Sequence, residues 1–471
     1  MLEKIIQYSI HHKLIVLLFT AGIIGFGFYS LSNIPIGAVP DVTNNQVQVI
    51  TTSRNLATED VEKFLTYPVE LEMANLPGVK EIRSVSKFGL SVVTVVFEDN
   101  IGTYLPRQLI AEKIKSAEEK IPAGFGTPFM GPVSTGLGEI YQYIINVDPK
   151  YKDTYSLTDI RTIQDWVVKR QLSGIPGVVE VNTWGGYLKQ YEVALNPERL
   201  RAMNISIFEA FNALEKNNSI AGGGYIEKLN ESYFIRGEGL VSSLEDIENI
   251  VVTTRENIPV FIKDIASVGF GKANRFGAIT GNGEGEKVLG QVMMLKGANS
   301  NAVINAVKDR VNEIQSSLPP GISINPFLER SELIGKTTFT VAENLILGSL
   351  IVIFVVVLLL GNLRSGLVVA SVIPLSLLFA ISLMNIFGID ANLMSLGAID
   401  FGLIVDGAVI IVEAIVHRLQ IRHSGKMLSQ SEMNSEVISS SQKIRSSAAF
   451  GEIIILMVYI PILALVGIEG K

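Results

Sequence analysis

The chain contains no cysteine, which excludes disulfides, thiolate metal sites and cysteine nucleophiles. Histidine is also scarce: all four lie near the ends of apolar runs and none lies between Ser32 and Thr340, which excludes a histidine-built zinc site there. Only 18% of the residues are charged, whereas soluble domains have about a quarter. The net charge of −7, without a basic patch interleaved with aromatics, argues against a nucleic-acid partner. No nucleotide loop, hydrolytic triad or cofactor motif indicates a soluble enzyme.

Long apolar runs are abundant, and 48% of the residues are hydrophobic. Five runs predict membrane-spanning helices, at residues 14–32, 345–360, 366–389, 391–419 and 448–468. The first run is longer than the core of a signal peptide, the competing interpretation, so an uncleaved helix is favoured. The polar stretch 418–447 carries five basic residues and is expected to be cytoplasmic, which places the long polar region between the first two spans outside.

The fourth predicted span contains three acidic residues, Asp400, Asp406 and Glu413. Each costs a few kcal/mol or more at the centre of a bilayer, so such residues indicate function. On a helix, Asp406 and Glu413 lie within about 20° of each other, whereas Asp400 lies roughly 120° away from Asp406. Carboxylates held in a low dielectric bind protons more readily, and the three acids therefore predict a proton relay. Glu452, near the start of the fifth span, is open to two interpretations, a relay acid or a residue that reaches the membrane interface.

The outer region contains an internal repeat, whose two copies lie about 100 residues apart. Each copy is predicted to contain a helix, a proline-glycine turn and strands, with turns at Leu76–Val79 and Ile175–Val178. A third helix-to-strand passage runs through Pro319–Gly321. Strands expected at 46–52, 141–147 and 288–296 complete βαβ units, so the fold is predicted to consist of ferredoxin-like α+β modules.

The region 200–271 is predicted to be a small inserted domain with an exposed hairpin. Its glycine cluster, Ala221–Gly224, is predicted to form the turn of that hairpin. The alternative, a phosphate-binding loop, lacks a matching glycine pattern and a helix that begins directly after it.

Several motifs resemble the heavy-metal efflux branch of the resistance-nodulation-division (RND) transporters. They are GAIDFGLIVDGAVIIVEAIVHRL, NIPIGAVPDVT, TGLGEIYQY, IQDWVVKRQLSGIPGVVEVNTWGGY and AGGGYIEKLNESYFIRG. The DFG…VDGAV…VE pattern is most similar to the cobalt-zinc-cadmium pumps. Family members are about twice as long and are built from two parallel halves, so the chain resembles an N-terminal half.

The resemblance implies an α-helical membrane domain joined to an α+β periplasmic domain in the bacterial inner membrane. The implied segments are 1–33 (interfacial segment and first span), 34–133 (first porter module), 134–199 and 272–333 (second porter module), 200–271 (docking subdomain) and 334–471 (spans two to five, with a cytoplasmic loop at 418–447).

The resemblance also implies a function, proton-driven export of divalent cobalt, zinc or cadmium. Asp400, Asp406 and Glu413 would form the relay, and Glu139 is the metal-binding residue carried over, although a solvated strand-edge acid is an equal interpretation. No cofactor is expected, because the proton motive force supplies the energy. The implied partners are two further protomers, a periplasmic adaptor and an outer-membrane channel, while the docking hairpin reaches a neighbouring protomer.

Three alternatives remain open for the function. The cargo could be copper(I), since Met293 and Met294 are soft ligands, but adjacent strand residues face opposite sides. The cargo could also be an amphiphilic organic molecule, which would favour a cleft lined with phenylalanine. Finally, the chain could be a non-transporting protein or one subunit of a split transporter.

Overall fold

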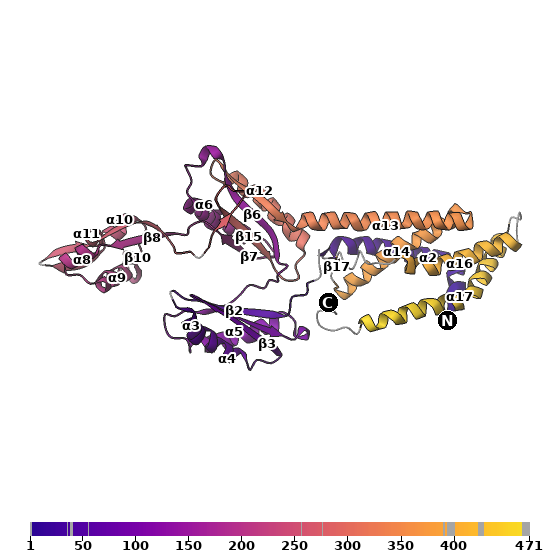
Figure 1. The fold of residues 1–471 in the computed structure, drawn as a ribbon, viewed down its shortest axis with the longest axis horizontal. Coiled ribbons are helices and arrows are strands. Elements are labelled where there is room, and N and C mark those ends of the chain that lie inside the picture. The colour runs from indigo at the N-terminus through magenta and orange to yellow at the C-terminus, as the bar shows by residue number, and fades with distance from the viewer. Residues whose placement is uncertain are drawn as a thin grey trace.

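The computed structural model describes residues 2–34, 36–37, 41–54, 56–255, 257–275, 277–389, 391–392, 401–422 and 428–463. A group of long helices occupies one end of the molecule, two α/β modules lie next to it, and a slender insert extends from the second module (Figure 1). Helices and modules are thus separated in space, as the division of the sequence into apolar and polar regions predicts.

Among the described residues, six helices form the helical end: α1 (Leu2–His11), α2 (Lys13–Asn33), α13 (Arg330–Leu360), α14 (Leu363–Phe387), α16 (Phe401–Arg422) and α17 (Gln430–Leu463). By length and composition, α2 and α14 could each cross a membrane, and shorter apolar stretches lie within α13 and α17. The apolar side chains of α2 are largely exposed, with Phe19 at 67%. A helix that is apolar on all sides and has little contact with the rest of the protein is suited to contact with lipid.

Module 1 is a four-stranded antiparallel sheet with helices on one face. Its strands are β2 (Gln46–Thr52), β3 (Val79–Lys87), β4 (Leu90–Phe97) and β5 (Pro128–Met130), in the order β3-β4-β2-β5. One continuous helical segment, made of α3 (Thr58–Val61), η1 (Glu62–Thr66) and α4 (Tyr67–Met73), packs with α5 (Tyr104–Glu118) over the sheet. The strand order is that of the predicted ferredoxin-like βαββαβ unit.

Module 2 repeats this arrangement. Its strands are β6 (Glu139–Val147), β7 (Val178–Trp184), β15 (Glu286–Met294) and β16 (Ile322–Glu329), and the short β14 (Ile279–Thr280) extends the edge beside β15. The covering helices are α6 (Leu157–Ile163), η4 (Gln164–Val168), α7 (Lys169–Leu172) and α12 (Ser300–Ser317). Pairing runs β16-β6-β15-β7, which matches the order in module 1.

The proline-glycine turns end helices and start strands as predicted. Gly78, Gly177 and Gly321 have φ values of 75°, 87° and 82°, a conformation that glycine adopts without steric cost. Each is followed by a strand, β3, β7 or β16.

One strand of the second repeat is placed differently from its counterpart in the first repeat. In module 1 both strands after the turn, β3 and β4, join one sheet, but β8 (Lys189–Leu195) leaves module 2 and pairs with β13 (Ala266–Lys272). Strand β15 takes the vacant position beside β7. The insert therefore begins with β8, and this two-stranded ribbon joins it to module 2 (Figure 1).

The body of the insert is small. It contains α8 (Pro197–Ala202), α9 (Ile207–Lys216), α10 (Leu244–Glu248), β11 (Val251–Arg255), β12 (Ile258–Phe261) and α11 (Ile262–Ile265). These elements share a hydrophobic core that includes Leu200, Ile247 and the fully buried Ile262.

The expected exposed hairpin is present, but the predicted position of its turn is wrong. Strands β9 (Ser219–Lys228) and β10 (Glu231–Gly239) are joined at Leu229 and Asn230, which both have positive φ, as a two-residue hairpin turn of type I′ requires. The glycine cluster lies within β9. At Gly223 a Cβ atom would collide with Ile235 on β10, next to an irregularity in the pairing, so a glycine fits the close approach of the strands.

The module 2 core provides a stability test at Gly290. The ring of the fully buried Tyr143 lies against Gly290, where a Cβ atom would overlap it. We expect Gly290→Ala to lower the free energy of unfolding by about 1–3 kcal/mol through overpacking. The matched control is Gly269→Ala in β13, where a Cβ atom meets nothing within 4 Å. Denaturant unfolding of the purified chain measures both, and equal stability of the two variants would contradict this account of the core.

Candidate functional site

Two of the three predicted relay acids lie on α16. Its face toward α13 and α14 is apolar, with Val405 buried against Val356 and Val369. Asp406 and Glu413 are both exposed in this chain and lie roughly 80–100° from that apolar face by helix geometry. The helix therefore packs through valines and leaves its carboxylates uncovered by the described helices. Asp400 lies outside the described residues.

Helix α17 brings a further carboxylate to α16. A carboxylate oxygen of the exposed Glu452 side chain sits where a Cβ atom on Gly407 would be, so a side chain at position 407 would require Glu452 to move. Gly407 directly follows Asp406 in the sequence. Of the two interpretations of Glu452 from the sequence, the packing favours a position beside the acidic helix. The glycine in VDGAV was the available sequence signal, because small residues let helices approach closely.

The polar stretch 418–447 is largely helical rather than a loop. Helix α16 continues to Arg422 and α17 begins at Gln430, so most of the stretch extends the two helices. Arg418 Nε lies 2.7 Å from a carboxylate oxygen of Glu436, an ion pair that joins the polar ends of α16 and α17.

A second candidate region is the sheet face of module 2 that points away from its helices. Three hydrogen bonds join side chains on this polar face. Trp184 Nε1 donates to Gln291 Oε1 at 3.1 Å, and Gln142 Nε2 donates to Glu139 Oε2 at 3.1 Å. Asn182 Nδ2 lies 3.2 Å from the sulfur of Met293. We call this set, with Glu180, the polar face.

Strand register aligns Glu139, Met293 and Glu180 across the polar face. Met293 of β15 is paired with Glu139 of β6 on one side and with Glu180 of β7 on the other. Adjacent strands are about 4.8 Å apart, so the two glutamates start roughly 10 Å apart with the thioether between them. Glutamate side chains are long enough to converge across that gap. The sequence analysis identified Glu139 but missed Glu180, since β-bulges on both sides of Met293 set this alignment.

The two methionines face opposite sides of the sheet, as strand geometry predicts. Met294 packs on the hydrophobic core of module 2, whereas Met293 lies on the polar face. Among the described residues there is no group of three or more His, Cys, Asp or Glu side chains that could hold a metal ion. The polar face can therefore offer a cation two carboxylates and one thioether, and further donors would have to come from elsewhere.

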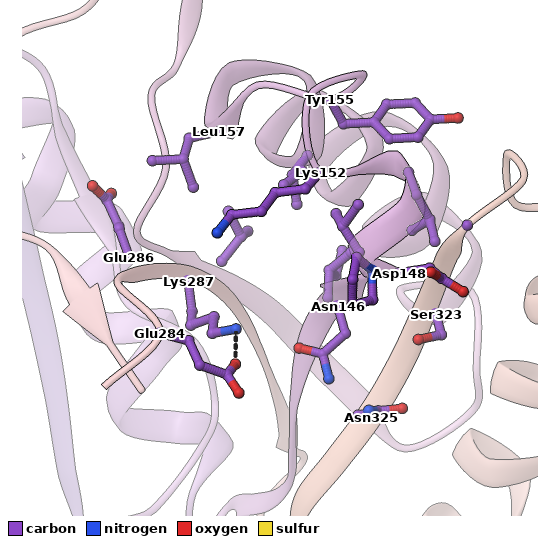
Figure 2. A pocket seen from close by; sticks show the side chains of 17 residues that line it. Asn146, Asp148, Lys152, Tyr155, Leu157, Glu284, Glu286, Lys287, Ser323 and Asn325 are labelled. Atoms are coloured by element: carbon purple, nitrogen blue, oxygen red, sulfur yellow. Dashed lines mark hydrogen bonds and ion pairs between the residues drawn. The ribbon is translucent and has the colours of Figure 1, made fainter. Parts of the chain in front are cut away.

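A hollow of about 860 Å³ lies at the other end of the module 2 sheet. Figure 2 shows Asn146, Asp148, Lys152, Ser323 and Asn325 around it, with Glu284 paired to Lys287. The Glu284–Lys287 distance is 2.7 Å, and Glu286 pairs with Arg275. These ion pairs match carboxylates with basic groups, so the hollow is electrostatically balanced and less suited to a cation than the polar face.

The fold of this chain is that of the RND-type transporters. A solved structure titled as a heavy metal efflux pump (crystal form II) aligns with 99% of this chain at a TM-score of 0.87 and 34% identity, while the chain covers 45% of that structure. The model of the AcrB/AcrD/AcrF family matches residues 5–471, and the chain belongs to this family.

The curated relatives carry metal-resistance names. The chain is 46% identical to the cobalt-zinc-cadmium resistance protein CzcA of Cupriavidus metallidurans and 36% identical to the cation efflux system protein CusA of Escherichia coli. Each alignment covers 100% of this chain and 45% of the relative. The chain thus spans about half the length of the curated relatives it matches.

The fit of Glu452 against Gly407 can be tested by a double-mutant cycle. Alanine is favoured over glycine within a helix by roughly 0.5–1 kcal/mol. Gly407→Ala should therefore gain less stability than Gly451→Ala, because Glu452 has to move away, and adding Glu452→Ala should recover the difference as an interaction energy of about 0.5 kcal/mol or more. The measurement is thermal unfolding of the detergent-solubilised chain. Gly451→Ala, where a Cβ atom meets nothing within 4 Å, is the control. Strictly additive effects would show that the two side chains do not meet.

Proposed function

We propose that this chain is part of the inner-membrane component of a proton-driven pump that exports divalent heavy-metal cations. The observation that carries the proposal is an apolar helix, α16, which bears Asp406 and Glu413 and packs against α13 and α14. Helix α13 in turn starts directly at the end of β16 in module 2. The helix that would carry the protons thus packs against a helix that continues directly from module 2.

In the proposed mechanism, protons from outside neutralise the relay acids. Neutralisation removes the free-energy cost of holding a charge in apolar surroundings. It thereby changes how α16 packs on its neighbours. The change moves α13 and, through it, module 2, which opens and closes toward the cargo. A potential of 100 mV supplies about 2.3 kcal/mol per proton, and a pH difference adds to it. The pump needs no organic cofactor in this scheme.

Cargo identity rests on chemistry and on similarity. The polar face presents Glu139 and Glu180, and carboxylates suit hard or borderline divalent cations better than copper(I). The relatives at 46% identity are named for cobalt, zinc and cadmium or for cation efflux. We therefore propose that Glu139 is a cargo ligand and that Glu180 assists it.

The membrane arrangement and the partners are part of the same proposal. Helices α2, α13, α14, α16 and α17 would cross the inner membrane, and the two modules and the insert would lie in the periplasm. The hairpin β9–β10 is exposed throughout, with Leu229 at 91% and Phe234 at 83%. Apolar side chains so exposed on a thin ribbon suit burial against another protein, here a neighbouring protomer of a trimer. A periplasmic adaptor and an outer-membrane channel would complete the path.

The relay assignment is tested with Asp406→Asn in the full-length gene product. Asparagine is similar in shape but cannot take up and release a proton, so we expect complete loss of resistance to zinc, cobalt and cadmium in an efflux-deficient host. Glu343→Gln, which changes an exposed acid on α13, is the control and should keep resistance. Resistance that survives Asp406→Asn at equal protein abundance would rule out the relay.

The cargo assignment is tested with Glu139→Gln. In proteoliposomes with an imposed pH gradient, we expect the KM for zinc to rise about 10- to 100-fold, the scale by which even outer-shell partners affect metal affinity. The control, Glu313→Gln, changes an exposed acid on α12 that is paired with Arg310. An unchanged KM in Glu139→Gln would remove Glu139 from the cargo site without touching the relay.

A further inference from the structure

The insert is joined to module 2 by a narrow neck of two chain segments (Figure 1). The outgoing segment, 185–188, follows β7, and the return segment, 273–275, follows β13. Beyond them lies the two-stranded ribbon of β8 and β13. A two-stranded ribbon is only marginally stable by itself, so the neck is where an insert of this kind is expected to swing.

The ribbon is firmly attached to the insert. At its far end, Val193 and Val268 pack against the hydrophobic core of the insert. At its near end, the rings of Tyr191 and Phe270 lie 5.5 Å apart, and Lys189 Nζ lies 4.0 Å from the centroid of the Phe270 ring. Aromatic pairs and a cation over a ring each stabilise such a ribbon. Freedom to swing is therefore confined to the neck.

Glu286, the first residue of β15, binds both segments of the neck. Its Oε1 accepts a hydrogen bond at 3.0 Å from the backbone nitrogen of Gly186 in the outgoing segment. Its Oε2 accepts a hydrogen bond at 2.9 Å from Nη2 of Arg275 in the return segment, while Nη1 of Arg275 pairs with Oε1. A bidentate pair of this kind fixes direction as well as distance. One carboxylate thus ties the outgoing and return segments to one strand of module 2.

Tyr187 joins the two segments to each other. Its hydroxyl accepts a hydrogen bond from Arg275 Nη2 at 3.0 Å, and the guanidinium carbon lies 3.8 Å from the centroid of its ring. Lys272 Nζ lies 4.3 Å from the same centroid. The backbone nitrogen of Ala273 donates to the carbonyl oxygen of Leu188 at 3.1 Å. The return segment is therefore held along its whole length.

The outgoing segment lies directly on β15. Gly185 and Gly186 have φ values of 74° and 65°, which glycine adopts without steric cost. A Cβ atom at Gly185 would overlap the carbonyl oxygen of Lys287, and one at Gly186 would crowd Val288. From the opposite side, Arg161 Nη1 donates to the carbonyl oxygen of Gly185 at 2.7 Å. The chain leaves β7 between the sheet and its covering helices, with little room to move.

We propose that Glu286 and Arg275 form a clamp that fixes the insert to β15, so that the insert and module 2 move as one body. Glu286 is the positioning residue, because it alone binds both segments of the neck. Since β15 also carries Met293 of the polar face, a displacement of this strand reaches the exposed hairpin β9–β10 through the clamp. The clamp depends on neither the relay nor the cargo assignment, and it stands or falls separately from the proposed function.

The absence of cysteine makes this chain suited to paired spin labels, because the introduced thiols are then the only ones. Asn312→Cys on α12 and Glu215→Cys on α9 place one label on module 2 and one on the insert, both at exposed positions. Pulsed electron paramagnetic resonance of the detergent-solubilised chain gives the distribution of distances between the labels. Dilution with unlabelled chain ensures that pairs within one molecule dominate. We expect one narrow distribution, and a broad one would overturn the fixed joint.

The clamp is then broken from either side. Glu286→Gln removes the ion pair, and the distribution should widen about twofold, because the ribbon by itself is only marginally stable. Arg275→Gln should widen it equally, and the double variant should widen it no further, since both changes break the same pair. Glu284→Gln, which breaks the neighbouring ion pair with Lys287, is the matched control and should leave the distribution unchanged. Unchanged widths in Glu286→Gln and Arg275→Gln, or equal widening in the control, would overturn the clamp.

A second pair of labels separates a loosened neck from a loosened insert. Glu215→Cys on α9 and Arg201→Cys on α8 place both labels within the insert, at exposed positions. Their distance distribution should stay narrow in each neck variant, because the core of the insert does not depend on the clamp. Widening of this pair in both Glu286→Gln and Arg275→Gln would show that the substitutions disturb the insert itself, and would contradict a clamp at the neck.

Discussion

The direct passage from β16 into α13 is the constraint on which the arrangement of this protein depends. A strand within a five-stranded sheet cannot slide without breaking backbone hydrogen bonds, and a helix of 31 residues transmits force along its axis. With no loop between Glu329 and Arg330, the sheet of module 2 and α13 move as one body or break at their joint. The Lys308–Glu329 ion pair and the hydrogen bond from Arg330 to the Leu137 carbonyl both lie at this joint.

The arrangement of α16 in the helical end reflects the free-energy cost of placing carboxylates in apolar surroundings. Helix α16 meets its neighbours through valines and keeps Asp406 and Glu413 on a side that the described helices leave open. The carboxylate of Glu452 reaches the same helix at Gly407. These acids are therefore available to protons or to groups beyond this chain, whose relatives are about twice its length.

The two α/β modules share one strand order but differ in which segment supplies one of the strands. Both have the same strand order and the same glycine turns, yet module 2 exchanges its third sequential strand, β8, for β15 and so gains the long insert. The exchange changes the sheet face, because β15 carries Met293 and aligns Glu139 with Glu180. The row of candidate cargo ligands therefore exists only because the insert interrupts the sheet.

The sequence by itself determined the apolar runs, the acids within one of them, the repeated turns and the exposed hairpin. These features depend on local chemistry: burial of apolar side chains, the conformational freedom of glycine and the cost of buried charge. Only the tertiary structure decided that β8 leaves its sheet, that the glycine cluster lies in a strand, and that Glu180 and Glu452 lie beside the predicted site residues. Those outcomes depend on contacts between residues far apart in the chain, where bulges shift register by one residue and pattern alone assigns no partner.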